Sequence, residues 1–299
     1  MIKYYKRYKT YAFHSTRCKD LRQYEACITK AYHSIEKGLS YTDYRPGFGR
    51  QNVDELVAML ESYSEIYDVS AFFYETALCT LHEYIKKNKE YGYEDKSLEK
   101  RILALKGVAN ESGGVIKFEP FGKDVNSFSF SDFIKSRHSM RHFSNIPADI
   151  QKITEAIKIA QHTPSACNRQ GWRSRIVVDP EILKILLENQ NGNRGFGQGI
   201  SSLIVVTGDL RCFNSSRELC QVFVDGGMYA MNILHGLHEM GLASIPLSAA
   251  LHEQQEKNVR KIAKIEDPEV LIMFIGVGNY PKHCITTRSE RSLHKIDIL

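Results

Sequence analysis

The stretch Ser136-Arg-His-Ser-Met-Arg-His-Phe143 places two arginines four positions apart, with a serine between them. Side chains at this spacing lie on one face of a helix, so we expect Arg137 and Arg141 to point the same way from a helical turn. A guanidinium group binds phosphate through paired hydrogen bonds, and the Ser139 hydroxyl adds a further donor. The stretch therefore predicts a phosphate site, although a solvated basic helix face has the same pattern.

A second polar stretch, Thr163-Pro-Ser-Ala-Cys-Asn-Arg-Gln-Gly-Trp172, follows further along the chain. Pro164 and Ser165 are typical of a chain that leaves a helix and enters a turn. The side-chain amides of Asn168 and Gln170 supply the donors and acceptors that could read the edge of a planar heterocycle. A structural loop between a helix and a strand is the alternative interpretation.

Helical and strand-like patterns alternate beyond residue 127. They predict a helix opened by Pro147, strands at 175–178 and 203–207, a long helix over 219–240 and an apolar central strand at 270–276. Gly241 has the usual position of a glycine just past a helix end. The alternation indicates a sheet flanked by helices, in the α+β or α/β class.

The order of these segments closely resembles the nitroreductase family of FMN-dependent oxidoreductases. The matching segments are Arg-His-Ser-x-Arg at 137–141, Pro-Ser-Ala-x-Asn-x-Gln-x-Trp at 164–172, Asp-Gly-Gly-Met-Tyr-Ala-Met-Asn at 225–232 leading to 240–248, Ile-Gly-Val-Gly-Asn-Tyr-Pro at 275–281, and Arg-Ser-Glu-Arg at 288–291. The resemblance implies an α+β fold with a mixed β-sheet flanked by helices. It also implies that 225–232 belongs to a long dimer-forming helix and 240–248 to a loop behind the flavin.

Members of this family place FMN across a homodimer interface, and the resemblance implies the same arrangement here. The residues expected to hold the phosphate and ribityl chain are Arg137, His138, Ser139, Arg141 and Arg291. The residues expected to line the flavin bound mainly by the other subunit are Pro164, Ser165, Ala166 and Asn168. The residues expected beside the isoalloxazine ring are Asn193, Pro246, Leu247 and Ser248.

In such proteins the flavin carries out hydride and electron transfer, while the protein binds and orients it. The resemblance thus implies an enzyme that passes reducing equivalents from NAD(P)H to an organic small-molecule acceptor. It requires no protein nucleophile or general base, and we assign no catalytic residue. Two alternatives stay open: a flavin-dependent dehydrogenase acting on a polysaccharide-linked substrate, and a non-catalytic flavin-binding scaffold.

Residues 1–118 are expected to form a helical N-terminal extension, and residues 119–299 the FMN-binding domain. Apolar residues recur at three- and four-residue steps from Leu56 to Tyr67 and from Phe73 to Ile85, which is the period of a helix. Glycines cluster between Gly107 and Lys123, where we expect a linker. The extension resembles one found on nitroreductase-like proteins encoded near polysaccharide biosynthesis genes.

Within the extension, His33 and Glu36 stand one helical turn apart. One such pair offers too few ligands for a metal ion, so we expect no metal site. A motif that packs over the flavin domain is the favoured interpretation. The alternative is that Lys37 and Arg45 cap the active site and select an anionic substrate.

The net charge of +5 is mild for 299 residues, and the dispersed basic residues argue against nucleic-acid binding. The start of the chain lacks the apolar core of a signal peptide, and no stretch reaches the roughly 18 apolar residues of a membrane span. Seven cysteines without a C-x-x-C pair predict reduced, mostly buried thiols in a cytoplasmic protein. The basic, aromatic first residues are expected to form a frayed terminus, with contact to an anionic membrane surface as the alternative.

Overall fold

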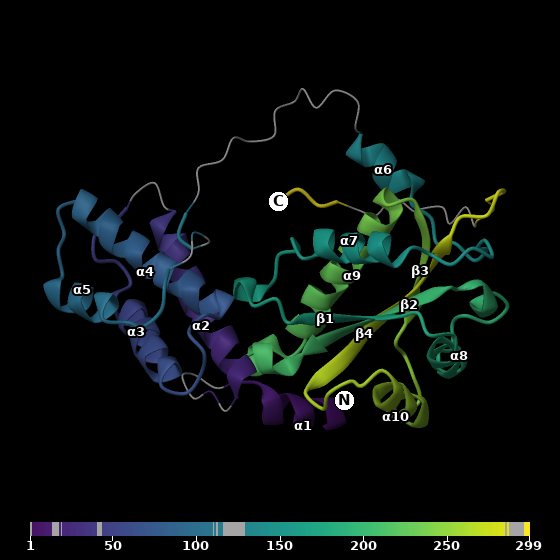
Figure 1. The fold of residues 1–299 in the computed structure, drawn as a ribbon, viewed down its shortest axis with the longest axis horizontal. Coiled ribbons are helices and arrows are strands. Elements are labelled where there is room, and N and C mark those ends of the chain that lie inside the picture. Colours follow the sequence, from purple (N-terminus) through teal and green to yellow (C-terminus); the bar gives the residue numbers. More distant parts are fainter. Residues whose placement is uncertain are drawn as a thin grey trace.

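The computed structural model describes residues 2–13, 18, 20–40, 44–109, 111, 113–115, 129–284, 286 and 296–299. A four-stranded sheet and a separate group of helices make up this part of the chain (Figure 1). None of the helices in these ranges has the length and apolar character needed to cross a membrane.

The sheet has the strand order β1-β2-β4-β3, and each neighbouring pair is antiparallel. Its strands are β1 (Trp172–Val177), β2 (Ser202–Asp209), β3 (Leu242–Ser248) and β4 (Glu269–Asn279). The predicted strands at 175–178, 203–207 and 270–276 are confirmed, and the apolar run in β4 is central, as expected. The prediction of a loop at 240–248 is wrong, because residues 242–248 pair with β4 along their whole length.

Helices cover both faces of this sheet, which confirms the α+β class (Figure 1). The expected mixed sheet is wrong, because all the strand pairs among the described residues are antiparallel. Side chains alternate across a strand, so Ile204 and Val206 of β2 face α7 (Ile150–Ala160) and α9 (Gln221–Glu239). Leu203 and Val205 face α8 (Pro180–Asn189) and α10 (Glu253–Ile262). A Cβ at Gly236 would lie 2.7 Å from the Ala156 carbonyl oxygen, so a glycine is needed where α9 crosses α7.

Two predicted helix positions need correction. The predicted helical turn at 137–141 is wrong: α6 (Phe130–Ser136) ends before it, and Arg137 is extended with φ −72° and ψ 120°. The helix expected to open at Pro147 begins later, at Ile150, where the Asp149 carboxylate accepts a hydrogen bond from Gln151 N. The long helix ending before Gly241, whose φ is +70°, is confirmed.

The predicted helical extension is confirmed for the residues that the structure describes. Its helices are α1 (Ile2–Tyr11), α2 (Leu21–Leu39), α3 (Arg50–Ser64), α4 (Phe72–Glu90) and α5 (Lys96–Leu103). Helices α2 to α5 enclose a hydrophobic core of their own. The predicted repeats supply much of it, with Leu56, Leu60, Ala77 and Leu81 fully buried.

Helix α1 and the first part of α2 pack instead against the sheet and its flanking helices, here called the sheet domain. The Tyr8 hydroxyl donates a hydrogen bond to the Ser215 carbonyl oxygen at 2.7 Å, and Tyr4 donates one to the Leu219 carbonyl oxygen. The prediction of a frayed terminus is therefore wrong, because the tyrosines of this basic segment have a buried partner surface. Helix α2 spans both hydrophobic cores, so the division at residue 118 stays a proposal, and most of the predicted linker lies outside the described residues.

Candidate functional site

The arginine-rich stretch runs along the edge of the sheet beside β3. Ser139 forms a parallel bridge with Ser244, and Met140 N donates to the Ser244 carbonyl oxygen at 3.0 Å. In a helical turn the Met140 N–H would bond to a carbonyl oxygen of the same segment. Here it bonds to β3 instead, which explains why the segment is extended. Arg137 and Ser139 are half-buried, whereas His138 and Arg141 are exposed.

Two histidines of α9 lie beside this stretch. His238 Nε2 is 2.8 Å from the Ser136 hydroxyl, and the His238 Nδ1 atom is 3.4 Å from the Tyr280 hydroxyl. Burial, with the positive charge of Arg137 as a second cause, lowers the pKa of both His235 and His238. Both shifts favour the neutral imidazole beside the Arg137 guanidinium. No group of three or more potential metal ligands occurs in the described part of the chain.

The predicted ring-side segments meet through a residue that the sequence did not reveal, the buried Gln190. Its Nε2 atom donates to the Ser248 carbonyl oxygen at 2.9 Å, and its Oε1 atom accepts from Asn193 Nδ2 at 3.0 Å. Asn193 also donates to the Leu187 and Gln190 carbonyl oxygens, both at 2.7 Å. The Asn193 amide therefore forms its hydrogen bonds within the turn that follows α8. For Gln190, the only sequence signal was that a polar residue ends the apolar helix α8.

Strand β3 connects the arginine stretch to the ring-side segment. Ser139 pairs with Ser244, and four residues further on β3 ends at Ser248, about 13 Å away at the usual rise of a strand. Of the ring-side residues, Pro246 is half-buried, Leu247 is buried and Ser248 is exposed. A cavity of about 810 Å³ lies between α8 and the loop at 193–201, and Asn193 is the one predicted residue among those that line it.

The loop from Thr163 to Gln170 has an unusual backbone. Cys167, Asn168 and Gln170 have φ values of 51°, 53° and 49°, a region that side chains other than glycine occupy at an energetic cost. Such a conformation persists only where neighbouring groups impose it. Ala166 N donates to the buried Asp225 carboxylate at 3.1 Å, and Gln170 N donates to the Ser165 hydroxyl at 2.9 Å.

An ion pair between the buried Arg169 and the half-buried Glu218 supports the same loop and was also missed from the sequence. Arg169 donates to both oxygens of Glu218, at 2.8 and 2.9 Å, and its Nε atom donates to the Ala166 carbonyl oxygen at 2.8 Å. Burial opposes ionisation of Glu218, but the hydrogen bonds from Arg169 and from Asn214 N lower its pKa overall. The sequence around Arg169 does not indicate that it pairs with Glu218, because Glu218 stands about fifty positions away in the chain.

The two predicted groups lie at opposite ends of α9. Ala166 is bound to Asp225 near the first turn, whereas Ser136 contacts His238 in the last turn. Thirteen helical residues separate these points, a distance of about 20 Å at 1.5 Å per residue. One chain thus gathers Arg137–Arg141 with β3 and keeps the loop at 164–168 apart from them. Arg291, the fifth residue expected to hold the phosphate, lies outside the described residues.

Comparison with known proteins locates the similarity in the sheet domain. The Nitroreductase family model matches residues 134–194 and 188–279. A curated protein of Archaeoglobus fulgidus, provisionally named an NADH dehydrogenase/NAD(P)H nitroreductase, is 30% identical over 153 residues, which cover 50% of this chain and 83% of that protein.

Solved structures of proteins with similar names also align with this chain. A Parabacteroides distasonis protein, provisionally named an NADH dehydrogenase/NAD(P)H nitroreductase, is 26% identical, covers 56% of this chain and 95% of its own, and has a TM-score of 0.49. A provisionally named nitroreductase from Desulfovibrio desulfuricans, in complex with FMN, is 18% identical, covers 55% and 91%, and has a TM-score of 0.48. By the family match and the Archaeoglobus relative, of which it covers most of the length, the chain belongs to the Nitroreductase family.

Proposed function

We propose that this protein is a homodimeric FMN-dependent oxidoreductase that takes reducing equivalents from NAD(P)H and passes them to an organic acceptor. The names of the Archaeoglobus relative and of the FMN complex from Desulfovibrio support this proposal. The observation that carries it is the extended stretch at 137–141, which pairs with β3 at Ser244. Four residues further on, the same strand ends at the ring-side Ser248.

The donor set in this run suits a phosphomonoester. Arg137 and Ser139 are half-buried, so their donors are partly shielded from water, and the exposed Arg141 adds a second guanidinium. With the phosphate at the Ser244 end of β3, the ribityl chain would follow the strand toward Pro246–Ser248. Bound FMN would supply the hydride and electron transfer. In this arrangement the residues at 137–141 fix the phosphate, and the backbone at 246–248 sets the position of the ring.

The remaining group would come from the second subunit. Because about 20 Å of α9 separates the Ala166 contact from the Ser136 contact, a twofold axis is the simple way to bring both groups onto one flavin. An exposed apolar stripe on α9 supports such an interface: Val224, Met228 and Met231 are 52%, 39% and 37% exposed. Their spacing of four and three residues places them on one helix face. The hydrogen bond from Ala166 N to Asp225 would then fix the position of Pro164–Asn168 beside the cofactor bound by the partner subunit.

We further propose that residues 1–118 form the extension, that residues 119–299 form the flavin domain, and that the protein works in the cytoplasm. None of the seven cysteines, all of which the structure describes, forms a disulfide, which suits a reducing compartment. Only Cys27 and Cys212 are buried, so the predicted burial of most thiols is wrong. The association with polysaccharide biosynthesis rests on the resemblance of the extension.

The test is to purify the protein and record its visible spectrum before and after NAD(P)H is added without oxygen. We expect a bound-flavin spectrum that NAD(P)H bleaches, and reoxidation by quinones or nitroaromatics. A colourless protein that takes up no added FMN would count against the proposal. Flavin that NAD(P)H leaves oxidised would favour the dehydrogenase alternative, and tight FMN binding without turnover on any acceptor would favour the scaffold.

A further inference from the structure

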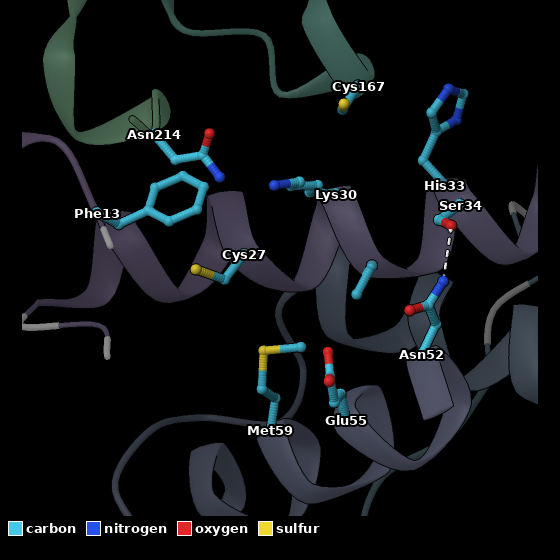
Figure 2. Close-up of a pocket in the computed structure, with 11 residues that line it drawn as sticks. Phe13, Cys27, Lys30, His33, Ser34, Asn52, Glu55, Met59, Cys167 and Asn214 are labelled. Carbon is cyan, nitrogen blue, oxygen red and sulfur yellow. Dashed lines mark hydrogen bonds between the residues drawn. The ribbon is translucent and has the colours of Figure 1, made fainter. Parts of the chain in front are cut away.

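Helix α2 crosses a cleft of about 450 Å³ where the extension meets the sheet domain (Figure 2). One side of the cleft belongs to α3, and the other includes Cys167 and Asn214, whose loops are joined by the pair Arg169–Glu218. Its volume falls within the range of small-molecule sites, about 300–1,000 Å³. None of the residues expected to bind FMN lines it, so the cleft is a separate feature.

Lys30 gives one end of the cleft a positive charge. Its ammonium group and the Asn214 amide point toward one another, and Lys30 Nζ lies 5.8 Å from the centre of the Phe13 ring (Figure 2). Within the described ranges no carboxylate forms an ion pair with Lys30. Glu218, whose charge interacts with that of Lys30, already accepts two hydrogen bonds from Arg169 and one from Asn214 N. The ammonium can therefore bind an added anion.

The other lining residues set the remaining requirements. Met59 and Cys27 form an apolar middle section (Figure 2), and Ala31 also lines the cleft. Glu55 lies on the α3 side, where its carboxylate accepts a hydrogen bond from Gln51 at 3.0 Å and would repel an anion. His33 Nδ1 lies 3.2 Å from the Glu36 carboxylate, so this imidazole already has an anionic partner. A ligand would thus place an anionic group beside Lys30 and an apolar body against the middle section.

We propose that this cleft binds a small organic anion, with one carboxylate, sulfonate or phosphate group on an apolar or aromatic body. Cys167 lies between Ala166 and Asn168, so the bound molecule would touch the outer side of the loop proposed to line the flavin. The extension and the sheet domain both contribute to this site. The proposal concerns binding alone and does not depend on whether the protein reduces its flavin.

The experiment measures binding of anilinonaphthalene sulfonate by fluorescence, using the full-length protein with and without added FMN. Phenylnaphthylamine, which has the same aromatic body but no sulfonate, is the neutral comparison. We expect Lys30→Met to weaken sulfonate binding by about tenfold or more through loss of a charge-assisted contact, and to leave phenylnaphthylamine unchanged. The matched control is Lys100→Met, an exposed lysine of α5 outside the cleft. Glu55→Gln should bind the sulfonate as tightly as the parent or more tightly.

A second measurement places the probe in this cleft. Alkylation of Cys167 by iodoacetamide, followed by peptide mapping, should slow when anilinonaphthalene sulfonate is present, and this protection should be lost in Lys30→Met. No saturable binding of the sulfonate, equal affinity in Lys30→Met and the parent, or an unprotected Cys167 would each overturn the proposal. Failure to bind FMN would overturn the proposed function, but sulfonate binding and Cys167 protection could still be measured.

Discussion

The guanidinium of Arg169 donates one hydrogen bond to each carboxylate oxygen of Glu218, at 2.8 and 2.9 Å, while its own side chain is 1% exposed. Glu218 also accepts a hydrogen bond from Asn214 N at 2.7 Å. The pair therefore joins the loop with positive φ angles to the turn after β2. A buried charge that loses its partner is strongly destabilising, so this contact gives a sharp test of what holds the loop in place.

Replacing Glu218 by glutamine should lower the free energy of unfolding by about 3 kcal/mol, because the amide keeps the shape but leaves Arg169 buried without a counter-charge. Urea denaturation would measure the change. Glu65→Gln is the control, since Glu65 pairs with Lys106 at the surface with its side chain 71% exposed, and we expect little effect there. Equal midpoints for the two variants would contradict the role given to the pair.

The same pair predicts a pH dependence. The folded-state pKa of Glu218 is lowered, because the hydrogen bonds from Arg169 and Asn214 N outweigh the effect of burial. Its contribution is therefore present above the unfolded pKa of glutamate, about 4.3, and is lost as the pH falls through the lower folded value. The stability difference between parent and Glu218→Gln should stay level near neutral pH and shrink below about pH 4. A difference that persists at the acid end of a urea series would show that another group is responsible.

Elements fixed by local pattern were predictable from the sequence. The apolar run at 270–276 is the inner strand β4, and the helix ending before Gly241 is α9, because both signals are short-range. The stretch at 137–141 was misjudged because Met140 N bonds to Ser244, about a hundred positions away. The roles of Gln190, Arg169 and Glu218 were missed for the same reason: a polar side chain does not reveal its distant partner.

Arg137→Ala should weaken FMN binding about tenfold or more, because charge-assisted hydrogen bonds are worth about 1.5–3 kcal/mol each. Arg291→Ala is expected to weaken FMN binding in the same way, because Arg291 is proposed to bind the same phosphate. Titration of the flavin-free protein with FMN, followed by fluorescence quenching, gives the affinities. The control is Arg217→Ala, an exposed arginine outside the predicted site. Parent-like affinity in both test variants would show that the phosphate site is wrongly assigned.

Cys18 and Cys27 should form a disulfide under mild oxidation. Their sulfur atoms are 2.9 Å apart, and the hydrogen bond between the two thiols lowers the pKa of Cys18, which favours the reactive thiolate. Oxidised glutathione would accept the two electrons and leave as two molecules of reduced glutathione. Peptide mapping without reductant should find the linked peptides, and Cys18→Ser should abolish them. Recovery of both cysteines as free thiols, while the exposed Cys220 and Cys284 are glutathionylated, would rule the pair out.

The strongest test of the two-subunit arrangement uses the apolar stripe of α9. A glutamate at Met228, as Met228→Glu, would bring a charge into the proposed interface, where it loses its hydration without gaining a partner. We expect a monomer by light scattering, and weak FMN binding even though Arg137 and β3 are intact, because the loop at 164–168 would have to come from the lost subunit. Phe72→Glu is the control, since Phe72 is 65% exposed on α4, and it should stay dimeric and yellow. A Met228→Glu monomer that holds FMN as tightly as the parent would mean that one chain builds the whole site, despite the length of α9 between its two halves.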